Sequence, residues 1–224
     1  MYFILFISYF LISTVKAELS GKYCEGYKTD FDIKKAIGRW HVVAIIPDTN
    51  FSTMFDNVTC YQVDFSEVDE ASLKWMITQR FGRPAEEIID NERGDVIRLR
   101  YHTEQPFDIW SKAVRDLSGC YRQLIDMKNN ETDIHLAKTL NSPMLLHVLE
   151  TKYGPFLLQM LWGRLSAVIY RREADITVEM LRPVYEFLSL YRGSAERPKL
   201  CNPLLTTTTI KESTPTTIKP KIIN

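Results

Sequence analysis

The sequence predicts an all-β domain followed by one late helix, and three observations indicate this. Over residues 38–172 the dominant hydrophobic period is two, which is typical of antiparallel strands with one wet and one dry face. Turn-forming residues such as Gly154 and Pro155 separate the alternating runs. Over residues 177–192 the apolar spacing changes to three and four residues, as on one face of a helix. A closed antiparallel barrel with a helix packed outside it fits this order, because closure removes exposed strand edges. A two-sheet sandwich is the alternative that periodicity leaves open.

Residues 1–17 predict a cleaved signal peptide. An apolar run from Tyr2 to Ile12 precedes a short polar stretch, and small residues before Glu18 fit a cleavage site. A membrane anchor is the alternative, but this run is short of the ~20 apolar residues that a span needs. We therefore expect a secreted, extracellular chain with no transmembrane segment and a folded domain over residues 18–202.

Alternation then assigns the strands. Residues 60–66, 73–78 and 95–101 each place alternate apolar side chains on one face, and Ile134 and Leu136 do the same in a shorter run. The further strand-like runs are residues 41–46, 107–114, 121–127, 144–151, 156–162 and 167–172. The side chains expected to face the interior are Val63, Phe65, Trp75, Ile77, Leu99, Tyr101, Ile134, Leu136, Leu158 and Met160.

The helix is expected over residues 177–192. Thr177 is a suitable N-cap and Gly193 a suitable stop, while Pro183 inside the helix should bend or shorten it. Residues 203–224, rich in Thr, Pro and Lys, have almost nothing to bury, so we expect a disordered tail. Its composition suits either an O-glycosylated stalk or a plain solvated segment.

Four cysteines, Cys24, Cys60, Cys120 and Cys201, are expected to form disulfides in a secreted chain, and three pairings are open. Three Asn-x-Ser/Thr triplets mark glycosylation acceptors on surface loops. They begin at Asn50, Asn57 and Asn130.

Composition and motifs exclude several classes of function. With 28 basic and 28 acidic residues the chain has no net charge, so the basic field that nucleic-acid binding needs is absent. The chain contains neither the G-x-S-x-G and H-E-x-x-H motifs nor a glycine-rich phosphate loop. Its four histidines have no metal-ligand spacing. We expect no catalysis, no metal and no cofactor.

Three patterns, in order, resemble the lipocalin family. Gly38-Arg39-Trp40 opens the first strand like the family's G-x-W signature. Thr151-Lys152-Tyr153 precedes the penultimate strand, where the family usually has Thr-Asp-Tyr. Arg172 closes the last strand, as an arginine does in lipocalins. The likeness covers residues 24–201 and is strongest to arthropod lipocalins of the bilin-binding and apolipoprotein D-like type.

The resemblance implies an eight-stranded up-and-down barrel with its C-terminal helix outside. Gly38, Trp40 and Arg172 would form a structural plug, in which the guanidinium lies across the indole. The family's disulfide scheme implies Cys60–Cys201 and leaves Cys24 with Cys120. Residues 82–118 hold more strand-like sequence than eight strands need, so an inserted hairpin or a long loop is expected there.

The function implied is that of a carrier. The inward set is large, apolar and aromatic, which suits a small hydrophobic ligand such as a bilin, retinoid, sterol or fatty acid. Periodicity leaves open whether these side chains line a pocket or fill a core. The alternative function is a secreted interaction protein with a filled barrel, which binds a cell-surface receptor or another protein through its loops or glycans.

Overall fold

The computed structural model describes residues 24, 30–46, 60–82, 84–87, 89, 94–103, 106–114, 117–126, 143–161, 166–192 and 198–201. The predicted signal peptide, the three glycosylation triplets, the Thr-rich tail, Ile134 and Leu136 lie outside these residues.

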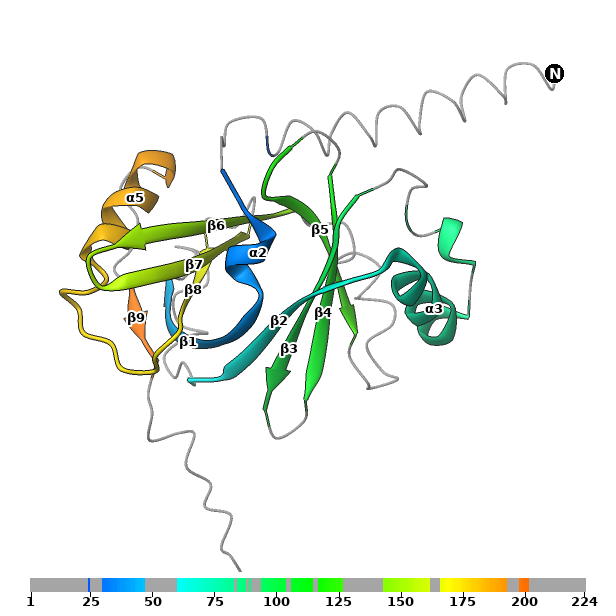
Figure 1. The fold of residues 1–224 in the computed structure, drawn as a ribbon, viewed down its shortest axis with the longest axis horizontal. Coiled ribbons are helices and arrows are strands. Elements are labelled where there is room, and N and C mark those ends of the chain that lie inside the picture. The colour runs from blue at the N-terminus through cyan, green and yellow to red at the C-terminus, as the bar shows by residue number, and fades with distance from the viewer. Residues whose placement is uncertain are drawn as a thin grey trace, which may run out of the picture.

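The strands of the described residues form one antiparallel sheet that closes on itself (Figure 1). β1 pairs with β8 along one edge and with β2 along the other, so the order from β1 to β8 is a ring. The predicted eight-stranded up-and-down barrel is therefore confirmed, and the sandwich alternative is wrong. The strands are β1 (Gly38–Ile46), β2 (Gln62–Val68), β3 (Val96–His102), β4 (Phe107–Ala113), β5 (Cys120–Asp126), β6 (Pro143–Thr151), β7 (Gly154–Leu161) and β8 (Ser166–Arg171).

A ninth strand, β9 (Lys199–Leu200), is short and pairs with β1 further along the edge that β2 occupies. The first residues of β1 pair with β2, and Ala44 and Ile45 pair with β9. The disulfide Cys60–Cys201 joins the residue that precedes β2 to the residue that follows β9. This bond therefore ties the two segments that share one edge of β1.

The second disulfide, Cys24–Cys120, anchors the N-terminal segment to the start of β5. Both pairings implied by the lipocalin resemblance are present.

Helix α3 (Glu70–Phe81) replaces the strand predicted over residues 73–78. Asp69 caps it by accepting a hydrogen bond from the Ser72 backbone N–H at 2.6 Å, and Gly82 ends it with a left-handed φ of 60°. Leu73 and Ile77 are buried one turn apart against the outside of the barrel. Trp75, predicted to face inward, is instead 68% exposed, because a residue two positions along a helix from Leu73 points elsewhere.

The insertion relative to a simple barrel is thus α3 with the short 3₁₀ helix η2 (Ala85–Glu87), between β2 and β3. β3 and β4 are both strands of the barrel wall, so the described part of residues 82–118 contains no inserted hairpin, and the hairpin alternative is wrong. The connection between α3 and β3 contains η2 and no strand among its described residues, which agrees with the long-loop alternative.

The C-terminal helix α5 (Arg182–Arg192) begins five residues later than predicted. Pro183 lies in its first turn, where a missing N–H costs nothing, so the proline starts the helix rather than bending it. Thr177 accepts a hydrogen bond from the Met180 backbone N–H in the turn before the helix. Figure 1 shows α5 and α3 on opposite sides of the barrel, both outside it. A short helix, α2 (Ile33–Ala36), precedes β1 at one end.

Candidate functional site

One end of the barrel is closed by Trp40, whose side chain is fully buried. Its indole Nε1–H donates to the Ala36 carbonyl of α2 at 2.6 Å. The Arg172 guanidinium carbon lies 3.7 Å from the centre of the indole ring, in a cation–π contact. We call this end the base of the barrel.

Arg172 also binds the backbone around the indole. Its guanidinium donates to the carbonyls of Lys35, Ile37 and Arg39 at 2.9–3.0 Å. Gly38 has a φ of 109°, and a Cβ placed there would lie 3.0 Å from the guanidinium. Gly38, Trp40 and Arg172 therefore lie together in the geometry expected of a plug, and the positive φ and close approach require glycine.

The interior wall brings four of the predicted inward residues together. Val63 and Phe65 of β2 lie opposite Tyr101 and Leu99 of β3, and all four are buried in one cluster with Trp40. The other fully or nearly buried members of that cluster include Val42, Ile97, Ile109, Tyr121, Met144, Leu146, Leu157 and Tyr170.

Leu158 and Met160 of β7 were predicted to face inward, and this is wrong. Both pack outside the barrel in the cluster that contains Leu181, Val184 and Leu188 of the α5 region. Both faces of β7 are buried, because one face lies towards the interior of the barrel and the other packs against α5. The alternation of wet and dry positions that fixes a register from sequence is then missing. Ile77 is likewise outside, in the cluster around α3.

The interior carries a polar cluster that the alternation of apolar and polar residues did not predict. The hydroxyls of Tyr101 and Tyr170 bond each other, and both approach the side-chain carbonyl of Gln159. Burial raises the pKa of Tyr101 to about 12, and burial followed by the neighbouring Tyr101 raises the pKa of Tyr170. Both phenols are therefore neutral at ordinary pH.

A second polar position lies on β4. Ser111 lies between Ile109 and Ala113, which pack in the interior cluster, so it shares their face of the strand. Its hydroxyl is fully buried and has no hydrogen-bond partner among the described residues. The buried Gln123 of β5 lies directly opposite. An interior wall of this kind offers a polar group to a ligand that is otherwise apolar.

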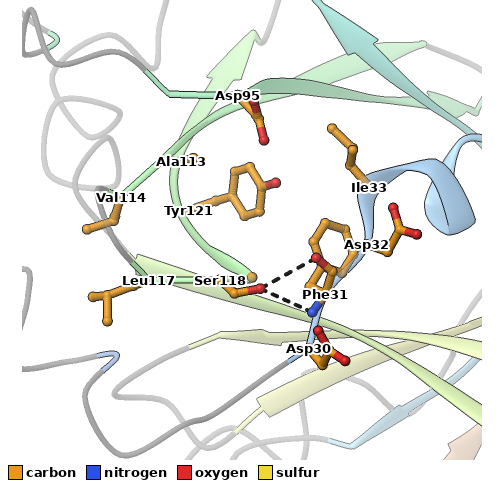
Figure 2. Close-up of a pocket in the computed structure, with 11 residues that line it drawn as sticks. Asp30, Phe31, Asp32, Ile33, Asp95, Ala113, Val114, Leu117, Ser118 and Tyr121 are labelled. Carbon is orange, nitrogen blue, oxygen red and sulfur yellow. Dashed lines mark hydrogen bonds between the residues drawn. The ribbon is translucent and has the colours of Figure 1, made fainter.

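A cavity of about 590 Å³ opens at the base, beside α2 (Figure 2). Ala113 and Tyr121 contribute the inner wall, the segment from Asp30 to Ile33 contributes the opposite side, and Asp95 lies on the rim. The connection between β4 and β5 completes the lining. The Ser118 hydroxyl accepts a hydrogen bond from the Phe31 backbone N–H at 3.2 Å and donates one to the Phe31 carbonyl at 3.4 Å. The rings of Phe31 and Tyr121 meet edge to face with centroids 5.9 Å apart.

Sequence reasoning missed this cavity. Its described lining comes from three segments, residues 30–33, Asp95 and residues 113–121, which are far apart in sequence, and no local pattern connects them. The one available signal is that Tyr121 is an aromatic residue at the first interior position of a predicted strand.

Comparisons with known proteins add little to this geometry. No protein-family model matches the chain, and no curated protein matches it. Among solved structures, the chain is similar to a major allergen of cockroaches, Per a 4, at 12% sequence identity and a TM-score of 0.40. The match covers 79% of this chain and 91% of that chain. A likeness this distant carries no functional argument, so the fold assignment rests on the strand pairing described above.

Proposed function

We propose that this protein is a secreted lipocalin of the arthropod apolipoprotein D-like or bilin-binding type, which carries a small, mainly hydrophobic molecule and catalyses no reaction. The observation that carries the proposal is the cavity of about 590 Å³ at the base, because its inner wall is formed by interior residues of the barrel, Ala113 and Tyr121. This volume is within the range of small-molecule sites in proteins.

The chemistry of the interior supports a ligand with an apolar body and few polar groups. Most of the described interior positions are apolar or aromatic. Ser111 supplies an unpaired hydroxyl, and the Tyr101–Tyr170–Gln159 cluster supplies neutral polar groups. Bilins, retinoids, sterols and fatty acids all combine a large apolar surface with such hydrogen-bonding groups.

The extracellular location is supported by the two disulfides, which persist in oxidising compartments. Over the part of the chain that the structure describes, no helix is long and apolar enough to cross a membrane.

A second candidate function is binding to a cell-surface receptor or another protein. The observation that favours it is Trp75, which stands 68% exposed on the inserted helix α3. Exposed tryptophan is enriched in the energetic centres of protein interfaces. This candidate requires no ligand in the barrel.

The test is native mass spectrometry of protein purified from its source, together with an absorbance spectrum and titration of the recombinant protein with a retinoid, a sterol and a fatty acid. A bound pigment or lipid, or saturable quenching of tryptophan emission, is expected. The substitution Ala113→Leu should narrow the cavity and weaken binding, whereas the matched control Ala71→Leu, at an exposed position of α3, should bind normally. Absence of any ligand and of any quenching would contradict the carrier function and favour the interaction function.

A further inference from the structure

The cavity at the base is bordered by negative charge. Three of its lining residues are aspartates, Asp30, Asp32 and Asp95, and no lysine, arginine or histidine is among the described residues that line it. Figure 2 shows Asp95 on one side of the opening and Asp30 and Asp32 on the other. A cavity with charge of one sign concentrates the oppositely charged ligand.

Two of these carboxylates are not used by the fold. Asp32 accepts a hydrogen bond from the Lys34 backbone N–H at 2.9 Å and so caps α2. Neither the Asp30 nor the Asp95 carboxylate makes an ion pair or a hydrogen bond with another residue that the structure describes. Because both are exposed, either could contact a ligand at little cost in desolvation.

Tyr121 is the independent observation that points to a ligand. Its side chain is only 3% exposed, and its hydroxyl has no hydrogen-bond partner among the described residues. Figure 2 shows the hydroxyl directed into the cavity, between Asp95, Ile33 and Phe31. Burial raises the pKa of Tyr121 well above its usual value, and the nearby charges of Asp95 and Glu67 raise it further. The phenol is therefore neutral, and its oxygen can accept a hydrogen bond from an N–H group.

The arrangement suits an organic cation better than a metal ion. The described residues contain no group of three or more His, Cys, Asp or Glu side chains placed to hold a metal. The carboxylates are instead spread around a space of about 590 Å³ that also presents the rings of Phe31 and Tyr121. Aromatic faces attract organic cations and bury the apolar part of the same molecule.

We propose that the cavity at the base binds a small organic cation, a protonated amine on an apolar or aromatic body, with the amine towards Asp30, Asp95 and the Tyr121 hydroxyl. The proposal rests on the carrier function and specifies the class of its ligand. It places the polar end of the ligand at the base, and the apolar end against the interior wall that Ala113 and Tyr121 share with the lumen.

The test compares three probes of one size and different charge by isothermal titration calorimetry of the full chain. Phenethylamine is cationic, 2-phenylethanol is neutral and 3-phenylpropionate is anionic at pH 7. We expect phenethylamine to bind at least tenfold more tightly than either other probe at low salt, with the advantage reduced at high salt because exposed charges are screened.

Variants then locate the site. The double substitution Asp30→Asn with Asp95→Asn should weaken phenethylamine binding by about three- to tenfold, the range expected for two exposed charge contacts. Tyr121→Phe should weaken it by a similar factor. The matched control Glu86→Gln, an exposed carboxylate on η2 outside the cavity, should bind as the unaltered protein does. Circular dichroism confirms that each variant is folded.

The outcomes separate this proposal from the carrier function. Equal binding of the three probes, or phenethylamine binding that the aspartate and tyrosine variants leave unchanged, would overturn the cation site. Lipid binding without phenethylamine binding would overturn the cation site and leave the carrier function in place. Binding of neither class of probe would overturn both.

Discussion

At the scale of single residues, Arg172 is the side chain that does most to organise the base of the barrel. One guanidinium covers the Trp40 ring and satisfies three carbonyls around β1 and α2. Without Arg172, the carbonyls of Lys35, Ile37 and Arg39 would lose these hydrogen bonds at the start of β1. Only the planar fork of arginine reaches all of them while stacked on an aromatic face.

We therefore expect Arg172→Lys to destabilise the fold almost as much as Arg172→Ala, by about 1–3 kcal/mol, because a lysine keeps the charge but loses the fork and the stacking. Urea denaturation followed by tryptophan fluorescence measures the change. Arg182→Ala is the control, since the Arg182–Glu186 pair is exposed on α5, and its effect should be much smaller. A lysine variant as stable as the unaltered protein would show that charge alone is sufficient at this position.

At the scale of elements, the two helices outside the barrel determine which faces of the wall are dry. α3 covers Val96 and Trp110, and α5 covers Leu158 and Ile169. The buried Lys112 amine lies 3.6 Å from Glu70, which ties α3 to β4. Strands under these helices are buried on both sides, whereas β2 from Gln62 to Ser66 has polar residues outside and apolar ones inside.

The contact between β6 and α5 includes a titratable group. The His147 ring stacks on Phe187 with centroids 4.4 Å apart, and its buried Nδ1 has no hydrogen-bond partner among the described residues. Burial lowers the pKa of His147, and the opposing effect of the Asp30 charge is smaller. Folding therefore favours the neutral ring.

This shift predicts a pH dependence of stability. Because the unfolded chain binds a proton more readily, the free energy of unfolding should fall as pH decreases from about 6.5, the usual histidine pKa, towards the lowered folded value. His147→Phe keeps a stacked ring and removes the titration, so its stability should change less between pH 7.5 and 5.5. Urea denaturation at several pH values compares the two proteins, and parallel curves would contradict the assignment.

At the scale of the whole molecule, barrel closure depends on β1, which pairs with β8, β2 and β9. The Cys201 backbone N–H donates to the Val43 carbonyl at 3.0 Å, so Cys201 extends the pairing along this edge of β1. The Cys60–Cys201 bond joins residues 141 apart in sequence and Cys24–Cys120 joins residues 96 apart.

Loop-closure entropy rises slowly with length, so removing either disulfide should cost a similar amount, roughly 5 kcal/mol at most. We expect the two double variants, Cys60→Ala with Cys201→Ala and Cys24→Ala with Cys120→Ala, to show comparable losses in urea denaturation. The two variants should differ locally. Only the loss of Cys60–Cys201 should speed hydrogen exchange at the backbone amide of residue 201, because β9 has two residues and no other covalent link to the barrel. Equal exchange in both variants would contradict this view of β9.

The barrel class could be predicted because the middles of β2 and β3 alternate, with Val63 and Phe65 or Leu99 and Tyr101 towards the lumen and polar residues between them. The positions of Gly38, Trp40 and Arg172 could be predicted from a resemblance, since each is a single residue in a short motif. The strand prediction over residues 73–78 is wrong because Leu73 and Ile77, four positions apart, satisfy both a period of two and a helical period. The cap at Asp69 and the stop at Gly82 were the signals that distinguish the two.

The register of β7 and the cavity at the base could not be predicted, for one physical reason. An amino-acid pattern reports the face of a residue only where one face meets water. Leu158 faces a helix that arrives later in the chain, and Tyr121 faces Phe31, ninety residues earlier. Both environments are created by packing between distant segments, so they exist only once the chain has folded.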